Sequence, residues 1–114
     1  MVKVYLSGAI SYVQNAIMMF DRTETILRDK GYEVVNPTLV PLPKGKEESE
    51  EYNEVGEWVW YMRRCLPLLV GCDKMLLLLG WEDSRGANLE KKLAEELKIT
   101  VYHDIKDLDE LRKS

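Results

Sequence analysis

The run MLLLL at residues 75–79 constrains the fold of this chain more than any other feature. It has the length of one strand and falls far short of the ~20 residues that a membrane-spanning helix needs. Because both alternating sets of side chains are apolar, both faces of such a strand must be buried. This is typical of the centre of a parallel sheet that helices cover on each side. The run therefore predicts an α/β protein.

The residues before that run predict a β-α-β unit. Residues 2–6 (VKVYL) form a short strand that ends in a Ser-Gly loop, and residues 32–35 form a second strand that an Asn-Pro pair stops. Between them a helix begins at Ser11 and ends at Gly31. The apolar spacing of this helix predicts one buried stripe, made of Val13, Ala16, Ile17, Phe20 and Leu27.

The second half of the chain is more varied. Residues 38–56 have no apolar period and predict a polar surface loop or lid, whose glutamates are solvated. A helix follows, which Pro67 should kink or split in two. Its buried stripe comprises Trp58, Met62, Cys65, Leu66 and Leu69. The remaining predicted elements are a strand at 74–79, a loop at 80–87, a helix at 87–98 with Leu89, Leu93 and Leu97 on its stripe, a strand at 99–102 and a helix at 107–113.

This order of elements predicts one domain over residues 1–114. We expect a three-layer α/β fold of the flavodoxin or Rossmann type, around a short parallel sheet of four or five strands. In open sheets of this kind a ligand binds beyond the carboxyl ends of the strands, near the point where the strand order reverses. The loops at 7–11, 36–38 and 80–88 should therefore face one crevice.

Charge argues against several classes of function. The net charge is −4, whereas proteins that bind the phosphate backbone of DNA or RNA are normally basic. We therefore expect no nucleic acid polymer as partner, while a free nucleotide needs only one or two local cations. The sequence shows neither a membrane span nor a signal-peptide pattern, which predicts a cytoplasmic protein.

The cysteines predict neither a disulfide nor a metal site. Cys65 and Cys72 would lie on one helix roughly 10 Å apart, which is too far for a disulfide. The chain has one histidine, His103, and no CxxC pair, so a zinc site is not expected. The two cysteines fit the role of small buried apolar residues.

Residues 84–90 (SRGANLE) are the most informative stretch for function. They lie where a buried strand gives way to a helix, whose first N–H groups and dipole suit an anion. Gly86 lets a ligand approach the backbone, and Ser84 and Arg85 would add a hydroxyl and a cation. Glu90 should stay ionised through the helix dipole, which makes it a candidate nucleophile. The alternative is an exposed glutamate without a functional role.

These residues belong to a wider pattern, made of Tyr5-Leu6-Ser7-Gly8, Asn36-Pro37, Cys72-Asp73 and the block 80–87 followed by Glu90. The pattern spans residues 2–102 and resembles the nucleoside 2-deoxyribosyltransferase superfamily, above all small phage and bacterial proteins related to nucleoside 5′-monophosphate N-glycosidases. The resemblance implies that Glu90 attacks the anomeric carbon of a nucleoside or nucleotide. The base leaves, and water or a second base completes a hydrolysis or a transfer. The resemblance also implies a homo-oligomer and no cofactor.

Further roles follow from the same resemblance. Tyr5 would lie near the reacting sugar, with Asn36 lining the sugar and base pocket, and Ser84 would contact a 5′-phosphate. Apart from the resemblance, Trp58, Trp60 and Trp81 could each stack on a base, although aromatic residues more often serve packing or dimer contacts. We favour Trp81, because it lies in the site loop. The other expected substrate-binding residues are Ser7, Gly8, Arg85 and Gly86.

Two positions depart from the pattern of the superfamily. Ser11 stands where the nucleotide hydrolases carry a phosphate-binding arginine, so either Arg85 replaces that arginine or the ligand is different. Cys65 stands where they carry a catalytic aspartate, and a thiol is a poor proton donor to a leaving base. Asp73 is the remaining acid nearby, either as a catalytic group or as a turn residue that caps the start of its strand. Two hypotheses stay open: an N-glycosidase, and a non-catalytic nucleotide-binding or sensing module.

Overall fold

The computed structural model describes residues 1–9, 14–41, 43 and 49–108. Its centre is a sheet of four parallel strands in the order β2-β1-β3-β4. The strands are β1 (Lys3–Ser7), β2 (Glu33–Val35), β3 (Lys74–Leu77) and β4 (Thr100–Tyr102). The α/β class and the central place of the apolar third strand are as the sequence predicts.

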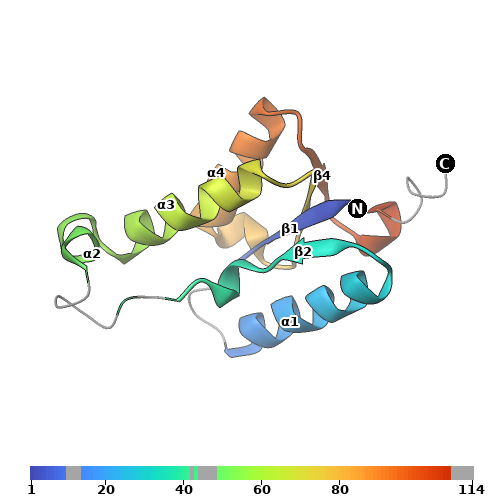
Figure 1. Cartoon of the computed structure of the whole chain (residues 1–114), viewed down its shortest axis with the longest axis horizontal. Coiled ribbons are helices and arrows are strands. Elements are labelled where there is room, and N and C mark those ends of the chain that lie inside the picture. Colours follow the sequence, from blue (N-terminus) through green and yellow to red (C-terminus); the bar gives the residue numbers. More distant parts are fainter. Residues whose placement is uncertain (10–13, 42, 44–48, 109–114) are drawn as a thin grey trace.

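Helices cover both faces of this sheet (Figure 1). They are α1 (Gln14–Asp29), α2 (Glu50–Val55), α3 (Glu57–Val70) and α4 (Arg85–Glu96), with two short 3-10 turns, η1 (Pro37–Leu39) and η2 (Trp81–Asp83). Residues 105–108 are also helical, and the rest of the helix expected at 107–113 lies outside the described residues, as does the expected N-cap Ser11. No helix in the described part of the chain is long and apolar enough to cross a membrane.

The alternation of side chains along the central strands divides the core in two. Val4 and Leu6 of β1 pack in a cluster with Phe20 and Leu27 of α1. Tyr5, one residue along, points to the opposite face and packs with α3 and α4. Since side chains alternate along a strand, Ser7 shares this second face with Tyr5. The hydroxyl groups of Tyr5 and Ser7 are thus directed at the α3–α4 layer.

Helix α1 ends as the sequence predicts, but its buried stripe differs. Gly31 adopts a φ of 93°, and the Gly31 and Tyr32 N–H groups donate to the carbonyls of Arg28 and Leu27, which is a Schellman motif. Ile17, expected in the stripe, is 49% exposed. Its place on the inner face is taken by Thr23, whose hydroxyl is satisfied by the Met19 carbonyl at 2.8 Å.

The prediction of a structureless loop over residues 38–56 is wrong for its last third. Ser49 caps α2 by accepting a hydrogen bond from Tyr52 N, and Gly56, with a φ of 88°, ends the helix. The glutamates are not all solvated either. Glu51 binds Arg63 and Arg64 of α3 at 2.8 and 2.5 Å, and these two guanidinium groups hold the pKa of its carboxyl down at about 2.

Two expectations about the long helices also need correction. Helix α3 is not split in two, since it is continuous with Pro67 inside it, while the alternative of a kink stays a prediction. The leucine stripe of α4 is not buried, since Leu89 and Leu97 are 38% and 47% exposed. The inner face of α4 is formed by Ala87, Glu90 and Ala94. Because Ala87 and Ala94 are small, the helix can approach the sheet closely. Glu90 lies on the same face of the helix and therefore points inward.

Candidate active site

Glu90 lies buried at the centre of the molecule, with 5% of its surface exposed. Its carboxylate accepts a hydrogen bond from the Tyr5 hydroxyl on one oxygen and from the Ser7 hydroxyl, at 2.7 Å, on the other. Both donors come from the same face of β1, where the strand order reverses between β1 and β3. This is the position at which open parallel sheets bind ligands. The alternative of an exposed glutamate is therefore excluded.

Burial changes the expected ionisation of Glu90. The loss of solvation raises the pKa of its carboxyl to about 7, and the hydrogen bonds from Tyr5 and Ser7 act in the opposite direction. The sequence predicted a side chain kept ionised by the helix dipole; a pKa of about 7 means that the ionised and the protonated forms are both present near neutral pH. Burial, followed by the charge of Glu90, raises the pKa of Tyr5, so its phenol stays protonated and able to donate. Near neutral pH the Glu90 carboxyl can therefore both hold and release a proton.

A Tyr5→Phe variant should raise the pKa of Glu90 further, because it removes a donor that favours the carboxylate. A hydrogen bond to a charged group contributes about 1.5–3 kcal/mol, which corresponds to roughly one to two pKa units. Titration of the Glu90 carboxyl by carbon-13 NMR measures this shift. Tyr102→Phe is the matched control, because Tyr102 is a buried tyrosine of the same sheet that packs on the opposite face. An unchanged Glu90 pKa in Tyr5→Phe would contradict the assigned contact.

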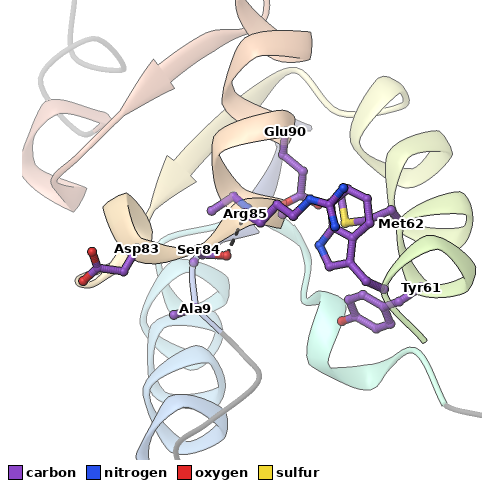
Figure 2. Close-up of a pocket in the computed structure, with 11 residues that line it drawn as sticks. Ala9, Tyr61, Met62, Asp83, Ser84, Arg85 and Glu90 are labelled. Carbon is purple, nitrogen blue, oxygen red and sulfur yellow. Dashed lines mark hydrogen bonds between the residues drawn. The ribbon is translucent and has the colours of Figure 1, made fainter. Parts of the chain in front are cut away.

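Glu90 borders a cavity of about 370 Å³, a size within the ~300–1,000 Å³ of small-molecule sites. Figure 2 shows Glu90 between Ala9 and Ser84 on one side and Tyr61 and Met62 of α3 on the other. The other residues on its wall are Gly8, Trp58, Asp83, Arg85, Gly86 and Ala87. The loops at 7–11 and 80–88 thus share one crevice, in their described parts, as the sequence predicts.

The start of α4 forms one wall of the cavity. Ser84 caps the helix by accepting a hydrogen bond from Ala87 N at 3.1 Å, and its own hydroxyl proton is left to donate. The Arg85 and Gly86 N–H groups belong to the first turn, where no intrahelical acceptor exists. Asn88 stabilises this turn, since its amide group donates a hydrogen bond to the Ser84 carbonyl at 2.8 Å. This wall therefore presents several donors and no carboxylate except Asp83, whose side chain points away from Glu90 (Figure 2).

Gly86 permits the close packing of this wall against α3. A Cβ at this position would lie 3.2 Å from the Met62 sulfur and 3.7 Å from the Trp58 indole nitrogen. Trp58 itself carries the Arg85 guanidinium, whose carbon lies 3.7 Å from the ring centroid. Sequence reasoning placed Trp58 on the buried stripe of its helix and missed this contact. No local signal could have revealed it, because the partners are distant in sequence.

Three residues expected at the site lie elsewhere. Asn36 is buried, but its amide group donates to Asp21 and Glu24 of α1 at 3.0 Å each, and it does not line the cavity. Asp73 accepts from Lys3 N at 2.9 Å, at the start of β3 and hence at the opposite end of the sheet from Ser7. Trp81 packs beside His103, with ring centroids 5.6 Å apart, and is not on the cavity wall.

Cys65 does border the carboxylate, as the position of a missing acid would require. It is fully buried and interacts electrostatically with Glu90, Tyr5 and Tyr61. Burial, and then the charge of Glu90, raises the pKa of its thiol to about 11. Cys65 and Cys72 are both free cysteines. Within the described residues no cluster of three or more His, Cys, Asp or Glu side chains could hold a metal ion.

Comparisons with known proteins agree with this architecture. A family model described as "Domain of unknown function (DUF4406)" matches residues 2–103. The structure is similar to a solved structure of a 2-deoxyribosyltransferase from the psychrotolerant bacterium Bacillus psychrosaccharolyticus, with a TM-score of 0.68 and 22% sequence identity over 88% of this chain and 69% of that chain. No curated protein matches the chain. The structural likeness confirms the predicted three-layer fold.

Proposed function

The chain belongs to the DUF4406 family, and we propose that it cleaves the N-glycosidic bond of a nucleotide or nucleoside, with Glu90 as the nucleophile. The observation that carries this proposal is the buried carboxylate itself, held by Tyr5 and Ser7 at the edge of the cavity. A carboxylate is the group that captures an oxocarbenium-like carbon in retaining glycosidases. The enzyme to which the fold is similar is a 2-deoxyribosyltransferase, which supports the same class of reaction.

The proposed reaction has two steps. In the first, a Glu90 oxygen bonds to the anomeric carbon as the carbon–nitrogen bond breaks, and the base leaves with the electron pair and takes a proton from solvent. In the second, water or another base attacks the same carbon and releases a proton to solvent, the ester bond breaks, and the carboxylate is restored. Tyr5 and Ser7 hold both oxygens of Glu90 throughout, so the carboxylate cannot rotate away from the sugar.

The donors at the start of α4 support a 5′-monophosphate as the preferred substrate. A phosphate fits the unpaired Arg85 and Gly86 N–H groups, the Ser84 hydroxyl and the positive end of the helix dipole. The Arg85 side chain begins beside these donors, and its guanidinium, which stacks on Trp58 in the same cavity, is a cation within the site. A nucleoside without phosphate would make none of these contacts.

A non-catalytic nucleotide-binding module is the second candidate, and one observation favours it. Retaining glycosidases use a second carboxyl about 5–5.5 Å from the nucleophile as the proton donor. Among the described cavity-lining residues the other carboxyl is that of Asp83, which points away, and Cys65 supplies a thiol with a raised pKa. A site of this kind would bind a nucleotide without consuming it.

Incubation of the purified protein with a panel of nucleoside monophosphates and nucleosides, with and without an acceptor base, tests the proposal. Free base is followed by chromatography, and ligand binding is followed by the shift in melting temperature. Base release supports the enzyme, and a raised melting temperature without release supports the binding module. Neither effect with any compound would overturn both. The mass of the same protein in solution tests the expected homo-oligomer.

A Ser84→Ala variant should weaken binding of a nucleoside monophosphate about tenfold or more, since a hydrogen bond to a charged group contributes about 1.5–3 kcal/mol. Binding of the matching nucleoside should not change. The lost N-cap also costs about 1 kcal/mol of folding stability. Ser84→Thr keeps the hydroxyl and serves as the control. Calorimetric titration with both ligands measures the difference, and an equal loss for both would place the phosphate elsewhere.

A further inference from the structure

The stacking of Arg85 on Trp58 points to a displacement mechanism, in which a bound base takes the place of the guanidinium. We propose that Trp58 is the stacking platform for the nucleobase, and that the Arg85 guanidinium covers it until a nucleotide arrives. The base then displaces the guanidinium, which turns to the phosphate of the same ligand. This inference rests on the proposed function, because it takes a nucleotide as the ligand of the cavity. It assigns recognition of the base to Trp58, and it gives Arg85 two alternative partners, the Trp58 ring and the phosphate.

The contact between the two side chains has the geometry of a stacked pair. The guanidinium carbon lies 3.7 Å from the centroid of the Trp58 ring, a distance typical of flat groups in van der Waals contact. A guanidinium is planar and weakly hydrated, so it can occupy an aromatic face in place of a base. Both side chains line the same cavity as Glu90. The face covered by Arg85 is thus within the proposed substrate site.

Arg85 is held by this stack alone within the described part of the chain. It forms no ion pair there, whereas Arg63 and Arg64 are both bound to Glu51. An exposed cation–π contact contributes only about 0.5–1 kcal/mol, while a charge-assisted bond between arginine and phosphate is considerably stronger. A ligand that offers a phosphate can therefore pull the guanidinium away from the ring.

Three other aromatic side chains, Tyr61, Trp60 and Trp81, already have partners within the protein. The Tyr61 hydroxyl donates to the Pro37 carbonyl, which fixes that ring. Trp60 is 8% exposed and stacks on Arg64 at 4.2 Å. Trp81 lies outside the cavity and contacts His103. Trp58 is the tryptophan of the described chain that lines the cavity, and its ring is only half-buried.

The layout of the cavity fits one nucleotide in one orientation. In Figure 2 the phosphate-binding side, marked by Ser84, and the α3 side, marked by Tyr61 and Met62, lie on either side of Glu90. The side chain of Arg85 extends from the start of α4 toward Met62 (Figure 2). A sugar opposite Glu90 would place its phosphate toward Ser84 and its base toward α3. Arg85 begins at the phosphate side and ends at the base side, so one side chain can serve both.

If the base displaces Arg85, the variant Arg85→Gln should bind a nucleoside more tightly and the matching monophosphate more weakly than the wild type does. In Arg85→Gln the stacking face of Trp58 is uncovered, so a nucleoside without phosphate should bind about two- to fivefold more tightly, in line with the contact that it no longer has to displace. The same variant loses its cation for phosphate, so the matching monophosphate should bind at least tenfold more weakly. A residue with a merely structural role would weaken both.

Removal of the platform tests the other half of the inference. Stacking on an aromatic side chain contributes about 1–3 kcal/mol per base, or roughly five- to 150-fold in affinity. Trp58→Leu should lower the affinity for a nucleoside monophosphate by this factor, and it should leave ribose 5-phosphate, which has no base, bound as tightly or more tightly. Trp58→Phe retains a ring and should recover most of the loss. Far-UV circular dichroism and the melting temperature show that each variant is folded.

Calorimetric titration of the wild type, these three variants and Trp81→Leu with a monophosphate, its nucleoside and ribose 5-phosphate tests the inference. The inference holds if Arg85→Gln strengthens binding of the nucleoside and weakens binding of the nucleotide. It also requires that Trp58→Leu weakens binding of the nucleotide but not of ribose 5-phosphate. It is overturned if wild type binds nucleotides but Trp58→Leu keeps their affinity, or if Trp81→Leu produces the loss instead. If wild type binds none of the three ligands, the proposed function itself has failed.

Discussion

A Glu90→Gln variant is expected to lose base release by about a thousandfold or more, because the amide cannot form the covalent bond to the sugar. The change is nearly isosteric, and the amide can still bond to Tyr5 and Ser7, so the cavity keeps its shape. Single-turnover measurement of base release, with the best substrate of the panel, gives the ratio of rates. Ligand affinity should change far less than the rate.

Glu96→Gln is the matched control for this experiment. Glu96 lies on the same helix but is exposed and outside the cavity. It should leave the rate unchanged. Full activity in Glu90→Gln would show that the carboxylate is not the nucleophile, and it would leave the site as a binding module.

The same substitution should stabilise the protein above neutral pH. The folded pKa of Glu90 is about 7, against an ordinary value of 4.5. A raised folded pKa means that the folded state binds the proton more tightly, so wild-type stability falls as pH rises from 4.5 through 7. By pH 8 this loss approaches about 3 kcal/mol. Glutamine does not titrate, so the Glu90→Gln variant does not undergo this loss of stability.

Urea unfolding of both proteins at pH 4.5 and pH 8 measures this effect. The advantage of Glu90→Gln should grow by about 3 kcal/mol between the two values, whatever the fixed difference between an acid and an amide at this position. Comparing the two pH values removes that fixed difference. A constant gap would mean that the buried carboxyl titrates like an exposed one. The pH of highest stability and the pH of a reactive nucleophile are thus expected to differ.

The sheet was predictable from sequence because its signals are local. The apolar run at 75–79, the Gly31 stop and the Asn36-Pro37 stop each act within a few residues, although β3 itself ends at Leu77 and Leu79 is exposed. Their consequence, a crevice at the carboxyl ends of the strands, follows from topology. The positions of Ser84 and Glu90 beside the cavity were predictable for the same reason, since both lie at fixed offsets from the start of one helix.

What the sequence did not reveal depends on contacts between distant segments. The stripe of Leu89 and Leu97 satisfied the helical period, yet the small residues Ala87 and Ala94 pack inward, because close approach to the sheet requires little volume there. The protonation of Glu90 depends on burial by elements far along the chain. The stack of Arg85 on Trp58 likewise joins two helices.

The hydrogen bonds to Glu90 span 83 and 85 positions of sequence. No contiguous third of this chain holds both the carboxylate and its two hydroxyl donors, so the site cannot exist in a partly folded molecule that retains only one end. The proposed site would then be lost as soon as α4 separates from β1. In a protein this small, activity would serve as a direct gauge of intact tertiary structure, more sensitive to global unfolding than any spectroscopic signal from a single helix.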